Sequence, residues 1–357
     1  MRKKEFNETV LLERQMIKIF TTGNPFAPGI PDLSALKRQG AEWDASEAID
    51  EVLIGYSALW PQNFATSTAL ASVTNKLKLI VAHRPGVMHP TAAARTFGTM
   101  DFLSGGGRLA INLVSGSSDK DLHREGDYLA KVERYDRATE YVECMKRCWS
   151  EPKSFDHQGK YYQAEAVRQL MRPMSGHIPI YMGGESDEAV EFGARHADVY
   201  MLWGEPLSGT RERIERVKAS AARHGREPQF SLSLRIFLGA TDEAAWEKAR
   251  AVERTILDAE GTNRFLRSAV TDKSVGRDRQ LSFANEAVHD DCFWAGLVKL
   301  LGGFANSAGL VGTPDRVMAA LRRYRELGVD AFLITTGLDG FWDPSLEDFV
   351  VQMKKEL

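Results

Sequence analysis

Cysteine is scarce in this chain, and its scarcity excludes a disulfide-stabilised scaffold. The 357 residues include three cysteines, Cys144, Cys148 and Cys292. Cys144 and Cys148 stand four residues apart in a helical pattern, with no histidine or second cysteine pair near them in the sequence. That spacing favours small buried side chains over metal ligands. We therefore expect neither a disulfide framework nor a bound metal.

Long apolar runs and an excess of one charge are also missing. The chain holds 46 lysines and arginines against 49 aspartates and glutamates, and the two signs are mixed along its length. No basic stripe is present that could follow a phosphate backbone, so nucleic acid is not an expected partner. The charged start is followed only by a short apolar stretch at 16–20, too short for a signal-peptide core or a membrane span. We expect a cytoplasmic protein that does not enter a membrane.

What the sequence does contain is a repeated alternation of short apolar runs and helical segments. Each β-branched run is followed by a polar or glycine-rich tip and then by apolar residues at three- and four-residue spacing, which is typical of βα units. Eight units predict a closed (β/α)8 TIM barrel. The alternative, an open doubly wound sheet, usually begins with a glycine-rich dinucleotide turn, which the first tip, Thr21-Thr22-Gly23-Asn24-Pro25, does not resemble. The predicted strands are 16–20, 52–54, 77–82, 108–114, 179–182, 198–202, 230–238 and 330–334.

Two segments depart from the simple repeat of the predicted barrel. Residues 152–173, after the fourth helix, indicate a small hairpin excursion. Residues 241–308 form a long insertion after the seventh strand, a position from which a barrel loop commonly covers the catalytic mouth. Within it, 302–309 has the glycine content of a flexible loop, although a plain connector explains that content nearly as well. We expect a single domain over 1–357, with the insertion above the active-site mouth.

Polar residues at the predicted strand tips are the candidate site, because function in a barrel gathers at the carboxyl ends of its strands. Gly184 and Ser186, in the tip Gly183-Gly184-Glu185-Ser186-Asp187, could bind an anion at a helix N-terminus, or Ser186 could simply cap that helix. Asn112 interrupts an apolar strand, so its amide needs partners that a ligand could supply. Arg134 and Tyr135 suit a phosphate and a ring, although a surface position for Arg134 is the commoner case.

Cationic residues form a second candidate group. His83 and Arg84 stand at the end of a buried strand, and Arg235 lies within a later one. Two inward-facing cations suggest an anionic substrate. A buried carboxylate that pairs with Arg235 would explain that residue equally well.

These segments together resemble the luciferase-like monooxygenases, and most closely their alkanesulfonate monooxygenase branch. The stretch KLKLIVAHRPGVMHPTAAARTFGTMDFLSGGGRLAINLVSGS at 76–117 carries the likeness. Further matching pieces are Glu133-Arg134-Tyr135, IPIYMGGESDEA, YMLWGEP and GLVGTPDRV, so the resemblance spans nearly the whole chain.

The resemblance implies a two-component flavin enzyme. A separate NAD(P)H:FMN reductase would deliver reduced FMN, which this protein would use with O2 to oxygenate a second substrate while shielding the site from water. Homodimers or homotetramers are usual in such a family. The residues implied to bind FMN are Tyr56, Ser57, Asn112, Arg134, Tyr135, Gly184 and Ser186.

The alkanesulfonate branch further implies cleavage of a carbon–sulfur bond to give an aldehyde and sulfite. The sulfonate would be bound by Arg84, Arg235, Trp203 and Lys299, and catalysis would involve Arg235, His83 and Trp203.

Three positions depart from the alkanesulfonate pattern. The loop Ser57-Ala58-Leu59-Trp60 lacks the expected cysteine, Ser233 and Arg235 stand where an arginine and a histidine are expected, and Gly337-Leu338 replaces a tyrosine. Three alternatives therefore stay open: another substrate such as a sulfone, a deazaflavin cofactor, or a flavin-binding relative without catalysis.

Overall fold

The computed structural model describes residues 16–23, 32–116, 118–258, 274–303, 307–335 and 342–357. Its centre is a closed barrel of parallel strands, because β1 pairs with both β2 and β13 and β9 pairs with both β8 and β13. The barrel strands, in order around the barrel, are β1 (Lys18–Gly23), β2 (Glu51–Ile54), β3 (Lys78–His83), β4 (Leu109–Leu113), β7 (Ile180–Met182), β8 (Val199–Trp203), β9 (Gln229–Leu238) and β13 (Ala331–Thr335).

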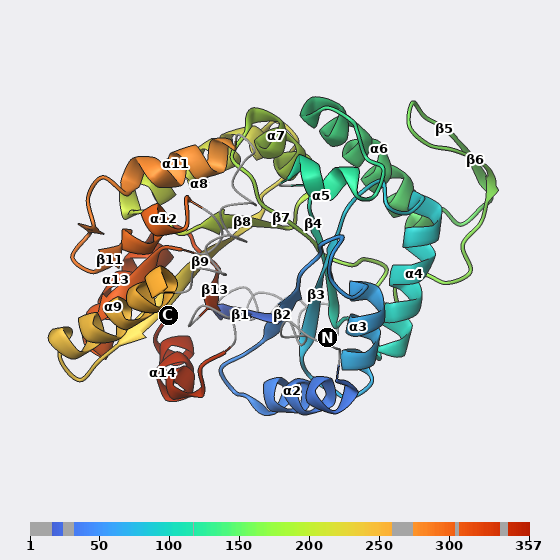
Figure 1. The fold of residues 1–357 in the computed structure, drawn as a ribbon. Coiled ribbons are helices and arrows are strands. Elements are labelled where there is room, and N and C mark those ends of the chain that lie inside the picture. Colours follow the sequence, from blue (N-terminus) through green and yellow to red (C-terminus); the bar gives the residue numbers. More distant parts are fainter. Residues whose placement is uncertain (1–15, 24–31, 117, 259–273, 304–306, 336–341) are drawn as a thin grey trace, which may run out of the picture.

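Helices surround the barrel on its outer face (Figure 1). Most follow a strand and return the chain to the opposite rim, as parallel pairing requires. The helices outside the insertion are α2 (Leu33–Ala45), α3 (Asn63–Ala71), α4 (Pro90–Leu103), α5 (Asp119–His123), α6 (Lys131–Ser150), α7 (Asp187–His196), α8 (Leu207–Ala222), α13 (Pro314–Glu326), the 3₁₀ turn η1 (Pro344–Leu346) and α14 (Glu347–Glu356).

The predicted TIM barrel is confirmed. Each of the eight predicted strands corresponds to a barrel strand, with ends that differ by a few residues. The predicted hairpin at 152–173 is also present, as β5 (Phe155–Gln158) and β6 (Gln163–Val167), which pair antiparallel. In Figure 1 this hairpin projects beyond α4 and α6, away from the barrel.

Strand alternation separates the barrel interior from the layer beneath the helices. In β3, Leu79 and Val81 belong to the large core under the helices, whereas Ile80 belongs to the core inside the barrel. The same alternation places Leu53, Met201 and Leu333 inside. Residues of one parity on each strand are therefore the ones that can line a cavity at the open end of the barrel.

The insertion after β9 is a folded subsidiary unit with a small core of its own. It contains α9 (Asp242–Asp258), α11 (Val275–Phe283), β10 (Val288–His289), β11 (Phe293–Trp294) and α12 (Gly296–Leu300), followed by β12 (Gly309–Gly312). Ala245 and Ala249 of α9 pack with Trp294 and Leu297. β12 pairs in parallel with Arg235–Leu238 of β9, beyond Ser233, the last residue of β9 paired with β8.

The prediction of a flexible loop or connector over 302–309 is wrong at its end, because Gly309 belongs to strand β12. A side chain at Gly309 would place its Cβ 3.1 Å from the Phe237 ring and 3.3 Å from Cβ of Arg235. The two strands therefore pack closely at Gly309, where a larger residue would have to displace its neighbours slightly. Residues 304–306 lie outside the described part of the chain.

The three cysteines are free and buried. Among the described helices, none combines the length and the apolar character that a membrane span requires.

Candidate active site

A cavity of about 390 Å³ opens at the carboxyl ends of the barrel strands. Its floor is the top of the barrel's interior core, where Leu53, Met201 and Leu333 reach upward from three strands. Ser231 and Ser233 of β9 complete the lining on that side. The Ser233 hydroxyl is buried and finds no hydrogen-bond partner among the described residues. This volume falls within the range of small-molecule sites, and the unpaired hydroxyl offers a ligand one hydrogen bond.

Asn112 lines this cavity because it shares the inward parity of Ala110 on β4. The segment that follows, Ser115 and Gly116, turns along the cavity wall. Gly116 has a φ of +95°, and a Cβ there would lie 2.6 Å from a methyl group of Leu122. The loop can therefore keep its course only with glycine at this position.

Three hydroxyl groups gather at one end of the cavity. The phenol of Tyr135, near the start of α6, interacts with the hydroxyls of Ser115 and Ser186. Burial raises the pKa of Tyr135, so its phenol stays protonated and can donate. Ser186 is the N-cap of α7, and its Oγ accepts a hydrogen bond from the amide of Ala189 at 3.3 Å. The helix-cap alternative for Ser186 is thus real, and the cap also faces the cavity.

The glycines beside this cluster are required by the protein's own packing. A Cβ on Gly183 would lie 2.4 Å from the carbonyl oxygen of Met201, and one on Gly184 would lie 2.5 Å from Cβ of Ala189. The Gly184 carbonyl accepts hydrogen bonds from Tyr200 at 2.7 Å and Arg213 at 2.8 Å. The backbone is therefore held close to α7 and β8, next to the helix N-terminus that favours an anion.

Lys131 is the cation that sequence reasoning missed at this end of the cavity. It is the first residue of α6, lines the cavity, and lies 3.9 Å from Glu188. Arg134, which was predicted to bind the cofactor, does not line the cavity. Its guanidinium donates to the Leu129 carbonyl at 2.8 Å and lies 3.6 Å from Asp119. Lys131 and Tyr135, four residues apart on one face of α6, both line the cavity.

Arg84 also lines the cavity, where two carboxylates hold it. It forms ion pairs with Asp121 at 2.5 Å and Glu125 at 2.9 Å, and its guanidinium lies over the Tyr56 ring. Tyr56 also lines the cavity, and its phenol donates to Glu125 at 2.5 Å. Ser57 donates to Asp121 at 3.2 Å instead of lining the cavity. The positive charge of Arg84 is therefore compensated within the protein.

His83 points away from the cavity, which argues against its predicted catalytic contact. It has the parity of Val81, so its fully buried imidazole faces the helices and packs against Phe64 and Phe97. Its Nε2 lies 2.6 Å from the hydroxyl of Tyr141 on α6. Burial lowers the pKa of His83 to about 3, which leaves the imidazole neutral. We assign it to the core between barrel and helices.

The other residues predicted for the substrate divide between cavity and surroundings. Trp203, at the end of β8, lines the cavity. Arg235 is buried, and its backbone amide donates to Ala308, but it is not among the residues that line the cavity. Lys299 lies exposed on α12, also outside the lining. Gly337 and Leu338 lie outside the described residues.

The insertion contributes the start of α11 to the cavity, through Ser274, Val275 and Gly276. A Cβ on Gly276 would lie 2.9 Å from Glu185 and 3.1 Å from the Trp203 ring, so the helix packs directly on these two residues. Further along α11, Arg279 pairs with the buried carboxylate of Glu205 at 2.8 Å and with Glu212 at 3.1 Å. These ion pairs hold α11 against the rim of the barrel.

No group of three or more histidine, cysteine or acidic residues within the described chain has the arrangement of a metal site. The cavity instead combines hydroxyls, an amide, a helix N-terminus and an apolar floor. That set suits a phosphorylated molecule with a flat, largely apolar body.

Comparison with known proteins agrees with the barrel fold. A family profile described as luciferase-like monooxygenase matches residues 27–331. A riboflavin lyase, solved with modified FMN and its substrate riboflavin, is 19% identical with a TM-score of 0.75 over 96% of this chain and 92% of that chain. EDTA monooxygenase from Chelativorans sp. BNC1 is 19% identical with a TM-score of 0.74 over 96% and 94%. An F420-dependent secondary alcohol dehydrogenase is 17% identical with a TM-score of 0.65 over 96% and 98%. At these identities the structural likeness identifies the fold.

Proposed function

Because the chain belongs to the luciferase-like monooxygenase family, we propose that it uses reduced FMN, supplied by a separate NAD(P)H:FMN reductase, and O2 to oxygenate a small organosulfur compound. The observation that supports the FMN part is the convergence of Asn112, Tyr135, Gly184 and Ser186 on one cavity. These residues come from two adjacent barrel strands, β4 and β7, or from the segments that follow them, and the parallel pairing of the two strands brings them together. The proposed assembly is a homodimer or homotetramer.

The residues of the cavity fit the two ends of FMN. Ser186, Tyr135 and Lys131, beside the N-terminus of α7, would hold the phosphate through hydroxyl and ammonium donors. Asn112 would hydrogen-bond the ring system, above the apolar floor of Leu53, Met201 and Leu333. When bound, reduced FMN supplies the two electrons that split O2, one oxygen atom entering the substrate and the other leaving as water.

Arg84 is the residue we assign to an organosulfonate, the first substrate class to test. The overall reaction would convert an alkanesulfonate, O2 and reduced FMN into an aldehyde, bisulfite, oxidised FMN and water. A sulfonate must compete with Asp121 and Glu125 for the Arg84 guanidinium. We therefore expect weak sulfonate binding, which strengthens when one competing carboxylate is neutralised.

The FMN assignment is tested by flavin titration, followed by quenching of flavin fluorescence. We expect Tyr135→Phe and Ser186→Ala each to weaken FMN binding about fivefold to tenfold, the effect of losing one ordinary hydrogen bond, and to leave riboflavin binding nearly unchanged. Ser220→Ala is the matched control, because the Ser220 hydroxyl on α8 donates to Glu191 of α7 and neither residue lines the cavity. Equal losses for FMN and riboflavin would refute the phosphate site, and binding of a deazaflavin in place of FMN would favour the hydride-transfer alternative.

The substrate assignment is tested with NADH, FMN, a flavin reductase and a panel of alkanesulfonates. We expect sulfite release that depends on O2, with a lower KM in Asp121→Asn because Arg84 gains freedom to bind the anion. If no sulfonate yields sulfite while a sulfone or another small molecule is oxidised, the sulfonate part is wrong. Flavin binding without any O2-dependent product would point to a non-catalytic relative.

A further inference from the structure

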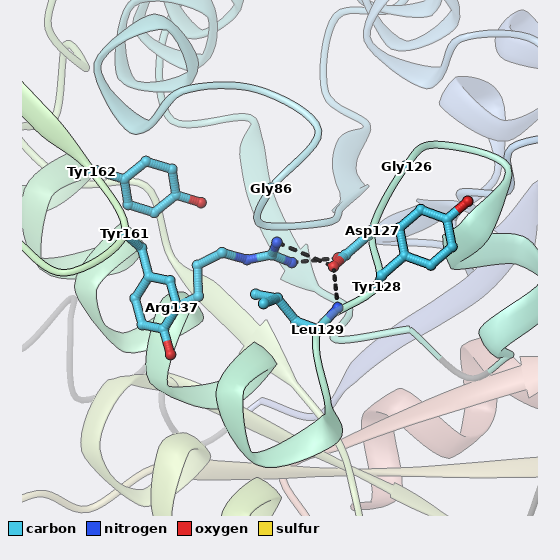
Figure 2. A pocket seen from close by; sticks show the side chains of 8 residues that line it. All are labelled: Gly86, Gly126, Asp127, Tyr128, Leu129, Arg137, Tyr161 and Tyr162. Atoms are coloured by element: carbon cyan, nitrogen blue, oxygen red, sulfur yellow. Dashed lines mark hydrogen bonds and ion pairs between the residues drawn. The ribbon is translucent and has the colours of Figure 1, made fainter.

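A second cavity, of about 460 Å³, lies outside the barrel mouth. It shares no lining residue with the first cavity among those the structure describes. Figure 2 shows its walls, which come from the loop after β3, the loop between α5 and α6, the helix α6 and the turn between β5 and β6. The residues used below are Gly86, Asp127, Leu129, Arg137, Tyr161 and Tyr162.

Arg137 crosses this cavity and fixes its walls. Its guanidinium pairs with Asp127 at 2.5 Å and donates to the Pro85 carbonyl at 2.8 Å (Figure 2). Gly86 has a φ of +108°, and a Cβ there would lie 2.5 Å from Cζ of Arg137. The side chains of Arg137 and Asp127 are only 12% and 9% exposed, so the walls are formed before any ligand arrives.

Three buried hydrogen-bond donors of this cavity have no partner within the described chain: the hydroxyls of Tyr161 and Tyr162 and Nε of Arg137. Tyr162 is 9% exposed and is held by edge-on contacts with the rings of His89 and Tyr141. Burial raises the pKa of Tyr162 to about 12, so its phenol remains a donor at neutral pH. In Figure 2 its hydroxyl points towards the Arg137 side chain, whereas the Tyr161 hydroxyl points the other way.

The charges around the cavity are already balanced. Arg137 is neutralised by Asp127, and Leu129 donates its amide to the same carboxylate at 3.3 Å. Behind the tyrosines, the Glu140 carboxylate accepts the amides of Tyr161 and Tyr162 at 3.0 and 2.8 Å. The exposed ammonium of Lys160 lies over the Tyr161 ring but does not line the cavity. An anion inside would therefore lie near the carboxylates of Asp127 and Glu140 without a free cation among the lining residues, and burying it would be unfavourable.

We propose that this second cavity binds a small uncharged aromatic molecule that carries a carbonyl-type acceptor. The acceptor receives hydrogen bonds from the Tyr162 hydroxyl and Nε of Arg137, and the aromatic body packs against Leu129 and the tyrosine rings. Aromatic packing and a satisfied buried donor both favour such a ligand over an aliphatic or an anionic one.

The test is a binding titration with benzamide, benzoate and toluene, followed by saturation-transfer NMR on the full chain. Benzamide should bind saturably and more tightly than benzoate, which has the wrong charge, and toluene, which has no acceptor. Tyr162→Phe should weaken benzamide binding about fivefold, the factor expected for one lost hydrogen bond. Tyr161→Phe is the matched control and should leave the affinity unchanged, because that hydroxyl points away.

The variant Trp203→Ala, which alters the first cavity, shows in which of the two cavities benzamide binds. Benzamide affinity should be unchanged in this variant, since Trp203 is not part of the second cavity. Loss of binding in Trp203→Ala but not in Tyr162→Phe would overturn the proposal. Tighter binding of benzoate than benzamide, or no saturable benzamide signal, would overturn it as well.

Discussion

His83 shows how strand parity decides the role of a single residue. Counting from Ile80, which lies inside the barrel, residues 82 and 84 share the inward parity and 83 does not. The sequence supplies this count, so the placement of Asn112 and Arg84 on the cavity could have been predicted and that of His83 excluded. The two carboxylates that pair with Arg84 could not have been predicted, because Asp121 lies on α5 and Glu125 in the loop after it, 37 and 41 residues along the chain.

The buried imidazole of His83 predicts a dependence of stability on pH. Its pKa is lowered by burial to about 3 in the folded chain, against 6.5 when unfolded. Between these two pH values the unfolded chain binds a proton at His83 that the folded chain does not bind. The contribution of neutral His83 to the free energy of unfolding is therefore fully present above pH 6.5 and decreases as the pH falls below that value. At pH 5 the loss amounts to about 2 kcal/mol at most.

We therefore expect His83→Gln to lose less stability than the parent chain between pH 7.5 and pH 5, as measured by urea unfolding at both values. The comparison uses the difference between pH values, so a uniform destabilisation by the substitution does not affect it. His123→Gln, at an exposed site, should behave like the parent. If His83→Gln loses as much stability as the parent chain between pH 7.5 and pH 5, protonation of His83 does not cause the loss.

At the scale of elements, the eight strands and the β5–β6 hairpin follow from the sequence because their apolar runs are bounded by clear turn residues. Strand β12 does not, since Gly309–Gly312 is short and carries glycine at both ends, which is typical of a loop. Its strand conformation comes from pairing with β9, a contact between distant segments. The same reason hides Lys131 and the start of α11, whose positions depend on how helices dock.

The ion pairs of Arg279 predict how α11 is held against the rim. Glu205 is almost fully buried, and two nitrogens of Arg279 bind its two oxygens at 2.8 and 2.9 Å. Removing one member of a buried pair costs about 3–5 kcal/mol, because the other charge stays buried without its partner. Arg279→Gln should therefore speed amide hydrogen exchange in Val275–Phe283, measured by mass spectrometry.

Arg223→Gln provides the matched control for this measurement. Arg223 pairs with Glu191 at 2.7 Å, but both side chains are about half exposed, and such surface pairs contribute little. Exchange in α11 should not change in this variant. Unaltered protection of α11 in Arg279→Gln would mean that its packing on Glu185 and Trp203 suffices to hold it.

At the scale of the whole molecule, the alternation of eight βα units predicts the barrel, and the family profile over 27–331 agrees with it. The position of the cavity follows as well, since strand tips of a closed barrel converge on one rim. The second cavity had no signal in the sequence. Its walls combine a helix, two loops and the excursion hairpin, and only packing shows that they meet.

Strand β9 is longer than its barrel neighbours, and the insertion is attached to the part of β9 that extends past β8. Its first half completes the barrel between β8 and β13, while Arg235–Leu238 pair with β12 after the insertion has returned. The insertion thus leaves from the end of β9 and returns to pair with that same end through β12. A change within the insertion therefore need not alter the pairing of β9 with β8 and β13, on which closure of the barrel depends.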